Sequence, residues 1–253
     1  MAPITQNLVV RIAVISDVHA NLYALESVLG AIDRNPPDEI WCLGDTVGYG
    51  PRPNECCALV RDRCSLTLVG NHDLVALGSS DVGVEDFNPE AGAASHWTAK
   101  ELSADSREFL SALEPKAARD GFELFHGSPR DPVWEYVLDD HVAAESFALT
   151  EEPTVLVGHS HVAMAIVSLG DGLDGRSVPD GHEVDLAAGR RLLNPGSVGQ
   201  PRDADPRAAW LELDLDATWA RFHRIAYPVA RTQAEIRERG LPDSLAERLA
   251  HGV

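Results

Sequence analysis

The sequence has few basic residues for its length. Lys and Arg together number 21 against 40 Asp and Glu, which gives a formal net charge of −19 at pH 7. Binding to DNA, RNA or an anionic membrane rests on Lys/Arg patches that neutralise phosphates, so the acidity argues against a long nucleic acid or a membrane as partner. A small phosphate ester held through bound cations stays compatible, because cations invert the local field.

Cysteine pairs with metal-binding or redox spacing and long apolar runs are also missing. The four cysteines show no C-x-x-C spacing, and the adjacent Cys56-Cys57 is a poor candidate for a disulfide. We therefore expect reduced thiols that are buried or half-buried, as is usual in the cytosol. Residues 1–7 contain no basic residue, and the apolar run that follows is interrupted by Arg11 and is too short to span a bilayer. The sequence predicts a cytoplasmic protein, and a homo-oligomer is compatible with it.

What the sequence does contain is an ordinary globular balance, with 44% hydrophobic and 24% charged residues. In its first part, Val/Ile-rich segments alternate with segments of helical periodicity. This alternation predicts an α/β domain with a partly parallel sheet. The expected strands cover residues 8–16, 39–43 and 65–69, and the expected helices cover 22–32 and 53–63.

The rest of the chain predicts a helical insertion, a β-rich second half and helices at the end. The insertion covers about 78–115, and the final helices cover about 229–251 with a break at Gly240. A Gly/Asp-rich segment at 170–181 is expected to be a loop. No repeat or boundary indicates a second domain, so residues 1–253 are expected to form one domain. The expected strands of this half cover 122–125, 154–157, 162–169, 183–186, 191–193, 208–215 and 219–225.

Polar clusters follow five of the expected strands. Each is a weak signal alone: a strand-end Asp is often a helix cap, and Gly-Asn often forms a turn. Together they are informative, because sites in α/β proteins form at the carboxyl ends of strands, where these clusters can converge. The candidate ligands are Asp17, His19, Asp45, Asn71, His126, His159 and His161.

These side chains supply carboxylate, amide and imidazole ligands in numbers sufficient for two divalent cations, with one carboxylate free to bridge them. Because no thiolate is present, Mn²⁺, Fe²⁺, Co²⁺, Ni²⁺ or Zn²⁺ fit better than a softer metal. His72 lies beside Asn71 and is followed by Asp73. An imidazole held by a carboxylate next to a metal pair is a candidate general acid or base.

The ordered motifs carry a resemblance to a known family. Asp17-x-His19, Gly44-Asp45, Gly70-Asn71-His72-Asp73, His126-Gly127 and Gly158-His159-x-His161 resemble the calcineurin-like metallophosphoesterase superfamily, and most of all its small bacterial and archaeal phosphodiesterase branch. The resemblance covers about residues 12–203 and includes the downstream loop at 194–199. It implies an α/β fold, a four-layer αββα sandwich of two mixed β-sheets flanked by helices, with a small helical insertion.

The same resemblance implies a site and a reaction. One metal would be held by Asp17, His19, Asp45 and His161, and the other by Asp45, Asn71, His126 and His159, with Mn²⁺ the expected ion. A metal-bridging hydroxide would attack phosphorus in line, while His72, oriented by Asp73, gives a proton to the leaving oxygen. The implied protein is a dinuclear metal-dependent phosphoesterase, a phosphodiesterase in the first place, that acts on a small phosphoester.

One departure from the family bears on the alternatives. Protein Ser/Thr phosphatases of the superfamily continue the second motif as Gly-Asp-x-x-Asp-Arg, whose Arg grips a phosphate monoester, whereas Gly48-Tyr49 stand at those positions here. This argues against a protein phosphatase or a diadenosine polyphosphatase, and puts a phosphodiesterase, or a phosphatase for a small ester, ahead. The alternative function within the superfamily is that of a phosphomonoesterase or protein phosphatase. An alternative of another class is a non-catalytic protein-binding scaffold, like the retromer subunit with this fold, which is expected to have lost ligands.

Residues nearer the substrate carry two interpretations each. Arg130 either contacts a phosphate or forms a surface ion pair. Tyr49, Trp134 and Tyr136 either stack on a nucleobase or serve packing. Ser197 either lines the pocket or shapes the turn of its loop.

Overall fold

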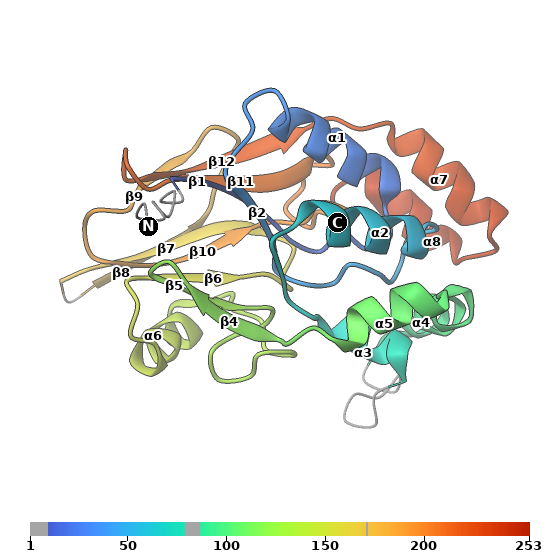
Figure 1. Cartoon of the computed structure of the whole chain (residues 1–253), viewed down its shortest axis with the longest axis horizontal. Helices are drawn as coiled ribbons and strands as arrows, with labels where there is room; N and C mark the ends of the chain where they lie inside the picture. The colour runs from blue at the N-terminus through green and yellow to red at the C-terminus, as the bar shows by residue number, and fades with distance from the viewer. Residues whose placement is uncertain (1–9, 79–86, 171) are drawn as a thin grey trace, which may run out of the picture.

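The structure, a computed structural model, describes residues 10–78, 87–170 and 172–253 and contains two six-stranded sheets (Figure 1). The first sheet has the order β3(Leu66–Thr67)-β2(Glu39–Cys42)-β1(Arg11–Ile15)-β11(Ala208–Asp214)-β12(Trp219–Ile225)-β9(Glu183–Asp185). The second has the order β4(Lys116–Arg119)-β5(Phe122–Phe125)-β6(Thr154–Val157)-β10(Arg190–Pro195)-β7(Ala163–Leu169)-β8(Gly172–Ser177). Both sheets are mixed, since β1, β2 and β3 run parallel in one and β5, β6 and β10 in the other.

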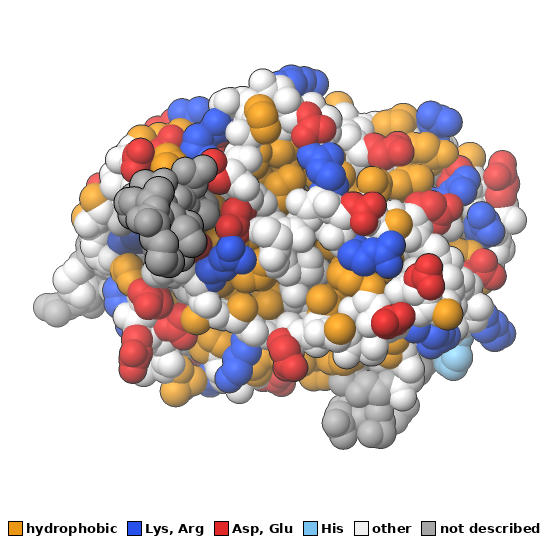
Figure 2. Space-filling view, viewed as in Figure 1, with side chains coloured by type: hydrophobic (Ala, Val, Ile, Leu, Met, Phe, Trp, Pro, Cys, Tyr) orange, Lys and Arg blue, Asp and Glu red, His pale blue; other side chains and the backbone are white. Residues whose placement is uncertain are grey.

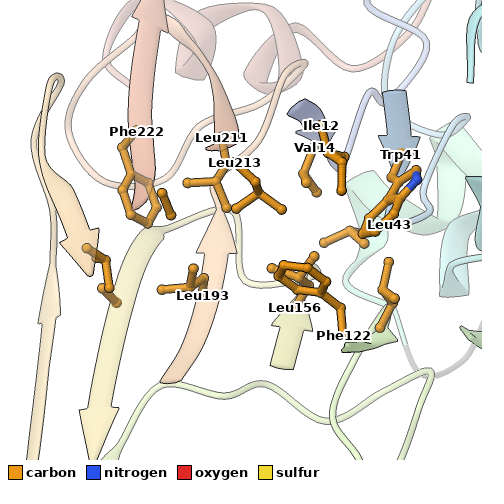
Figure 3. Close-up of a cluster of buried hydrophobic side chains, with 14 of the residues drawn as sticks. Ile12, Val14, Trp41, Leu43, Phe122, Leu156, Leu193, Leu211, Leu213 and Phe222 are labelled. Atoms are coloured by element: carbon orange, nitrogen blue, oxygen red, sulfur yellow. The ribbon is translucent and has the colours of Figure 1, made fainter. Parts of the chain in front are cut away.

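The main core lies between the two sheets. Along β1, Ile12 and Val14 point into this core, whereas Ala13 and Ile15 belong to a cluster on the opposite face. Successive side chains of a strand point to opposite faces of the sheet, so a strand buried on both faces carries apolar residues at every position. Figure 3 shows the inner side chains of the two sheets meeting, among them Trp41, Leu156 and Phe222.

Helices cover the outer face of each sheet (Figure 1). On the first sheet, α1 (Leu22–Ile32) and α2 (Pro53–Arg63) pack their apolar sides against β1, β2 and β11. On the second, α6 (Asp140–Leu149) packs Ala143 and Phe147 against β6 and β7. Asn21 caps α1 by accepting a hydrogen bond from the backbone N–H of Ala24. The predicted αββα sandwich of two mixed sheets is confirmed.

A further group of helices lies at one end of the sandwich, which Figure 1 shows at the right. The segment expected as a helical insertion contains α4 (Pro89–Glu101) and α5 (Ala104–Ser111), and its residues 79–86 lie outside the described part of the chain. α3 (Asn71–Leu77) precedes it. The terminal helices are α7 (Val229–Glu238) and α8 (Asp243–Glu247), followed by a short 3₁₀ turn over Arg248–Ala250. Apolar residues of α4, α7 and α8 form one cluster with Tyr49.

Four elements, namely β4, β8, α3 and α6, were not expected from the sequence. The predicted loop at 170–181 is corrected, because it contains β8, an edge strand that pairs antiparallel with β7. Most of its side chains are exposed, so the strand needs no apolar residues. Its sequence GLDGRS therefore lacks the alternating apolar pattern that predicts a strand. β4 is likewise a polar edge strand, and α6 has few apolar residues at helical spacing.

The surface and the thiols agree with the composition. Acidic and basic side chains are interspersed over the face that Figure 2 shows. The four cysteines are free, three of them buried and Cys64 half-buried, as expected. Across the described residues, no helix is both long and apolar enough to cross a membrane.

Candidate metal centre

The candidate ligands come together where strands of both sheets end. Asp17, Asp45 and Asn71 follow β1, β2 and β3 of the first sheet, and the histidines at 126 and 159 follow β5 and β6 of the second. Hydrogen bonds join the two groups of loops: the His159 N–H donates to Asp17 Oδ2 at 3.1 Å, and His126 Nδ1 donates to the Leu43 carbonyl at 2.9 Å. All of the candidate ligands are buried, none more than 4% exposed.

The backbone at these positions is unusual. Positive φ angles are found at Asp17 (52°), His19 (47°), Asp45 (52°), His159 (64°) and His161 (60°). The left-handed region costs a non-glycine residue on the order of 1 kcal/mol or more, so it persists only where the surroundings enforce it. Strain of this kind clusters at functional sites and here coincides with the residues whose side chains converge.

Each of the two carboxylates has one anchored oxygen and one free oxygen. Asp17 Oδ2 accepts the N–H of His159, and Asp45 Oδ1 accepts the N–H of His72 at 2.9 Å. Asp17 Oδ1 and Asp45 Oδ2 are buried and have no hydrogen-bond partner within the described chain. An ionised oxygen that is buried without a partner is costly, and a cation at this position would remove the cost.

The imidazoles are held so that a lone pair faces the same space. His19 Nδ1 donates to the Val47 carbonyl at 3.0 Å, and His161 Nδ1 donates to the Gln200 carbonyl at 2.6 Å. Because both Nδ1 atoms carry the proton, both Nε2 atoms present lone pairs, only 2.9 Å apart. Two facing lone pairs repel each other, and a cation bound by both nitrogens would remove this repulsion. A hydrogen bond from the other ring nitrogen is typical of metal-ligating histidines.

The distances divide the ligands into two overlapping sets. Asp17, His19 and His161 can place ligand atoms within 4.8 Å of one another, and so can Asp45, His126 and His159. Asp45 Oδ2 lies 3.6 Å from His19 Nε2 and 3.5 Å from His126 Nε2, between the two sets. Asn71 Oδ1 lies 3.1 Å from His126 Nε2. These residues fit divalent cations, with the Asp45 carboxylate in the shared position.

The electrostatics of the protein alone favour the ligating forms of most of these groups. Burial lowers the pKa of His19 to about 4 and that of His159 to about 3, so both imidazoles are neutral at pH 7. Burial also raises the pKa of Asp17 to about 7. Burial alone would lower the pKa of His126, but the Asp45 carboxylate outweighs it and raises this pKa to about 9. A proton on His126 then supplies positive charge that a bound cation would displace.

His72 lies beside this centre and lines the neighbouring cavity. Its ring packs against Phe87 and Tyr49, with centroids 4.4 and 4.3 Å away. Gly48 makes this packing feasible, because a Cβ there would lie 2.7 Å from His72 Nδ1. His72 could also complete a third ligand set with His19 and Asp45.

The expected contact between Asp73 and His72 is corrected. The Asp73 carboxylate accepts backbone hydrogen bonds from Gly70 at 3.0 Å, Thr46 at 3.2 Å and Val47 at 2.9 Å. These bonds engage both oxygens, and none joins the two side chains within the described residues. Asp73 therefore fixes the loop after β2, which in turn carries Gly48 and Tyr49 against the His72 ring.

Of the expected substrate contacts, Tyr49, Trp134 and Tyr136 line the cavity, whereas Arg130 and Ser197 do not. Arg130 does not, because its guanidinium forms ion pairs with Glu135 and Glu145, so the surface interpretation replaces the phosphate contact. Ser197 is fully buried and donates to the Asp17 carbonyl at 2.8 Å, so it shapes the loop and does not face the cavity.

The cavity beside the centre has a volume of about 270 Å³. Asn71, His72 and His159 form the wall on the side of the candidate ligands. The other walls include residues that the sequence did not single out, namely Phe87, Arg202 and Arg248. The nearest sequence signal was for Arg202, which lies three residues after the 194–199 loop.

We expect chelation of metal to lower the melting temperature by about 5–15 °C, because the buried free oxygens of Asp17 and Asp45 lose their cation. Thermal unfolding of protein treated with EDTA, before and after addition of Mn²⁺, measures this shift. The double variant Asp17→Asn/Asp45→Asn is the control and is expected to show no Mn²⁺-dependent shift. A wild-type melting temperature that ignores both EDTA and Mn²⁺ would contradict a metal centre.

Comparison with known proteins gives consistent similarities. A family model described as the calcineurin-like phosphoesterase superfamily domain matches residues 10–216. The crystal structure of a metallophosphoesterase from Sphaerobacter thermophilus is 44% identical, with a TM-score of 0.87, over 97% of this chain and 100% of that chain. An uncharacterized protein of Methanocaldococcus jannaschii is 35% identical over 95% of this chain and 98% of its own length. A symmetrical bis(5′-nucleosyl)-tetraphosphatase of Actinobacillus pleuropneumoniae is 27% identical over 62% of this chain, which spans 56% of that enzyme.

Proposed function

This chain belongs to the calcineurin-like phosphoesterase superfamily and is a hydrolase, and from that premise we propose that it is a dinuclear metal-dependent phosphodiesterase acting on a small phosphate ester. We propose Mn²⁺ as the metal, with Fe, Zn, Ni or Co as alternatives, because the ligands are nitrogen and oxygen without thiolate. We also propose that residues 1–253 form one metallophosphoesterase domain, since one core spans β1 to β12.

The position of the Asp45 carboxylate carries this proposal. Its free oxygen lies within 3.6 Å of imidazoles from two different ligand sets, which is the arrangement that a bridging carboxylate requires. Asp17, His19 and His161 would complete one metal site, and Asn71, His126 and His159 the other. Two divalent cations held there would neutralise phosphate oxygens and make a bound water acidic enough to act as nucleophile near pH 7.

The remaining chemistry is assigned to the chain's own residues. His72 lines the cavity beside both ligand sets, so it can donate a proton to the leaving oxygen. Burial keeps its pKa well below the ordinary value, so His72 has to take up a proton in the bound complex before it can donate one. Asp73 acts as a positioning residue, because its bonds to backbone amides hold the loop against which His72 packs.

The size and chemistry of the cavity support a small substrate. About 270 Å³ suits a small organic phosphate and not a stretch of duplex or peptide. A second candidate function is cleavage of a dinucleoside polyphosphate, which the similarity to a bis(5′-nucleosyl)-tetraphosphatase favours. Gly48-Tyr49 in place of the Asp-Arg pair speaks against that candidate, unless another basic residue takes over the role of the missing Arg.

Hydrolysis of bis-p-nitrophenyl phosphate tests the proposal. We expect turnover with Mn²⁺ that EDTA abolishes, together with slower turnover of the monoester p-nitrophenyl phosphate. The monoester being preferred would shift the assignment to a phosphomonoesterase. Inertness of the metal-loaded protein toward diesters, monoesters and dinucleoside polyphosphates alike would refute the enzymatic proposal and favour a protein-binding scaffold.

A further inference from the structure

Two arginines from distant parts of the chain face the cavity next to the candidate metal centre. Arg202 comes from the loop after β10, and Arg248 from the turn after α8. Both line the same space as Asn71, His72 and His159. A cavity of about 270 Å³ therefore has the candidate ligands on one side and two guanidinium groups on another.

Neither guanidinium is neutralised by a side chain in the described part of the chain. Arg202 Nη2 donates to Gln200 Oε1 at 2.8 Å and to the Tyr49 hydroxyl at 3.3 Å, while its Nε is buried without a partner. Arg248 Nε donates to Val253 O, an oxygen of the terminal carboxylate, at 2.5 Å. No Asp or Glu side chain in residues 10–78, 87–170 or 172–253 forms an ion pair with either one, whereas Arg52 and Arg224 are both paired with carboxylates.

The two positive charges act on each other. Burial lowers the pKa of Arg248, and the charge of Arg202 lowers it further. Like charges brought together in a partly buried site are unfavourable, and an anion between them removes that cost. Phosphate is the anion that suits planar guanidinium groups best, because they bind its oxygens in a bidentate manner.

Arg202 is held in place by the residue that breaks the family pattern. Its guanidinium carbon lies 5.7 Å from the centroid of the Tyr49 ring, and Tyr49 stands where the second motif of protein phosphatases has part of its Asp-Arg pair. A basic group therefore reaches the same cavity from a different segment. The cavity therefore contains a guanidinium group that can bind phosphate, although the motif lacks the Asp-Arg pair.

Aromatic side chains form much of the remaining cavity wall. Trp134 and Phe87 pack edge to face with centroids 5.7 Å apart, and Tyr136 stacks on His159 at 4.0 Å while remaining 44% exposed. Such rings offer a face to a planar ligand at low entropic cost. An aromatic wall combined with two guanidinium groups that no Asp or Glu side chain of the described residues neutralises fits an organic group that is both flat and multiply charged.

We propose that Arg202 and Arg248 bind a second phosphate of the substrate, next to the phosphoryl group at the metal centre, while the aromatic wall stacks on a planar ring. The substrate class is then a small aromatic ester with at least two phosphates, of the nucleoside diphosphate type. This inference rests on the proposed function for the position of the reacting phosphoryl group, but not for the anion site itself.

Binding of ADP, AMP and inorganic pyrophosphate tests the inference. We expect ADP to inhibit hydrolysis of bis-p-nitrophenyl phosphate at least about tenfold more strongly than AMP, because only ADP reaches the arginine pair with a second phosphate. Pyrophosphate is expected to bind more weakly than ADP, because it lacks the ring. Calorimetry with protein treated with EDTA gives the same comparison without turnover.

Substitutions show whether the arginines cause the preference. Arg248→Gln and Arg202→Gln are each expected to reduce the ratio of ADP to AMP affinity to near one, and Arg248→Lys to restore part of it. Arg237→Gln, on α7 and outside the cavity, is the matched control that keeps the ratio and the activity. Thermal unfolding of every variant separates loss of binding from loss of fold.

The outcomes distinguish the two proposals. Equal affinity for ADP and AMP in the wild type, or a preference that survives both Arg→Gln variants, overturns the second-phosphate site even if the enzyme hydrolyses diesters. Inertness toward every phosphoester, together with an arginine-dependent preference for ADP in calorimetry, overturns the proposed function and leaves the anion site standing.

Discussion

We expect Asp45→Asn to remove metal from the centre and to lower kcat/KM on bis-p-nitrophenyl phosphate about a thousandfold or more, ~4 kcal/mol of transition-state stabilisation. The amide can keep the bond to the His72 N–H through its oxygen, but it then turns an NH₂ group toward His19 and His126. Because an amide nitrogen neither carries negative charge nor accepts a cation, the position shared by the two ligand sets is lost.

Elemental analysis and steady-state kinetics on the same preparation measure both effects. The matched control is Asp174→Asn, the same change at a carboxylate that is 66% exposed and pairs with Arg176. It is expected to keep wild-type metal content and turnover. Wild-type metal content and activity in Asp45→Asn would show that this carboxylate is not the bridge, and the dinuclear proposal would fail with it.

His72→Gln is expected to have a different signature. It should keep wild-type metal content, yet lower the turnover of an alkyl or nucleoside diester by about 10²–10⁴-fold, the range for loss of a general acid. Turnover of p-nitrophenyl esters should fall much less, because p-nitrophenolate leaves without a proton. Glutamine fills much of the space between Tyr49 and Phe87, which limits repacking.

The comparison of leaving groups carries this test. His141→Gln, at an imidazole that is 78% exposed, is the control and is expected to leave the turnover of both substrates unchanged. A loss of metal in His72→Gln would assign His72 to the third ligand set with His19 and Asp45. An equal loss on both leaving groups would assign it to substrate binding and not to proton transfer.

Much of the candidate site follows from local sequence. Each carboxylate and amide ligand lies within four residues of the end of a strand, so its place at a strand end is readable from the hydrophobic pattern. The residues alone did not show that the strands belong to two sheets. That arrangement depends on pairing between β1 and β11 and between β6 and β10, which are far apart in sequence.

The parts that the sequence did not reveal depend on partners without a side-chain signature. Asp73 was expected to hold His72, but its acceptors are filled by backbone amides, which every residue except proline carries. Arg130 and Arg202 are both arginines near a motif, and only their tertiary neighbours distinguish them. Arg130 forms ion pairs with two glutamates, whereas Arg202 donates hydrogen bonds to a tyrosine and a glutamine.

The left-handed backbone at the ligands has a consequence for how this chain can change over generations. Each of Asp17, His19, Asp45, His159 and His161 holds a conformation that glycine would adopt freely, and together they cost on the order of 5 kcal/mol, comparable with the net stability of a whole domain. A lineage that no longer needed the chemistry would gain stability from almost any drift toward glycine or asparagine there. At these five positions the chemistry of the side chain and the stability of the fold oppose each other, so a descendant turning into a scaffold would change there first.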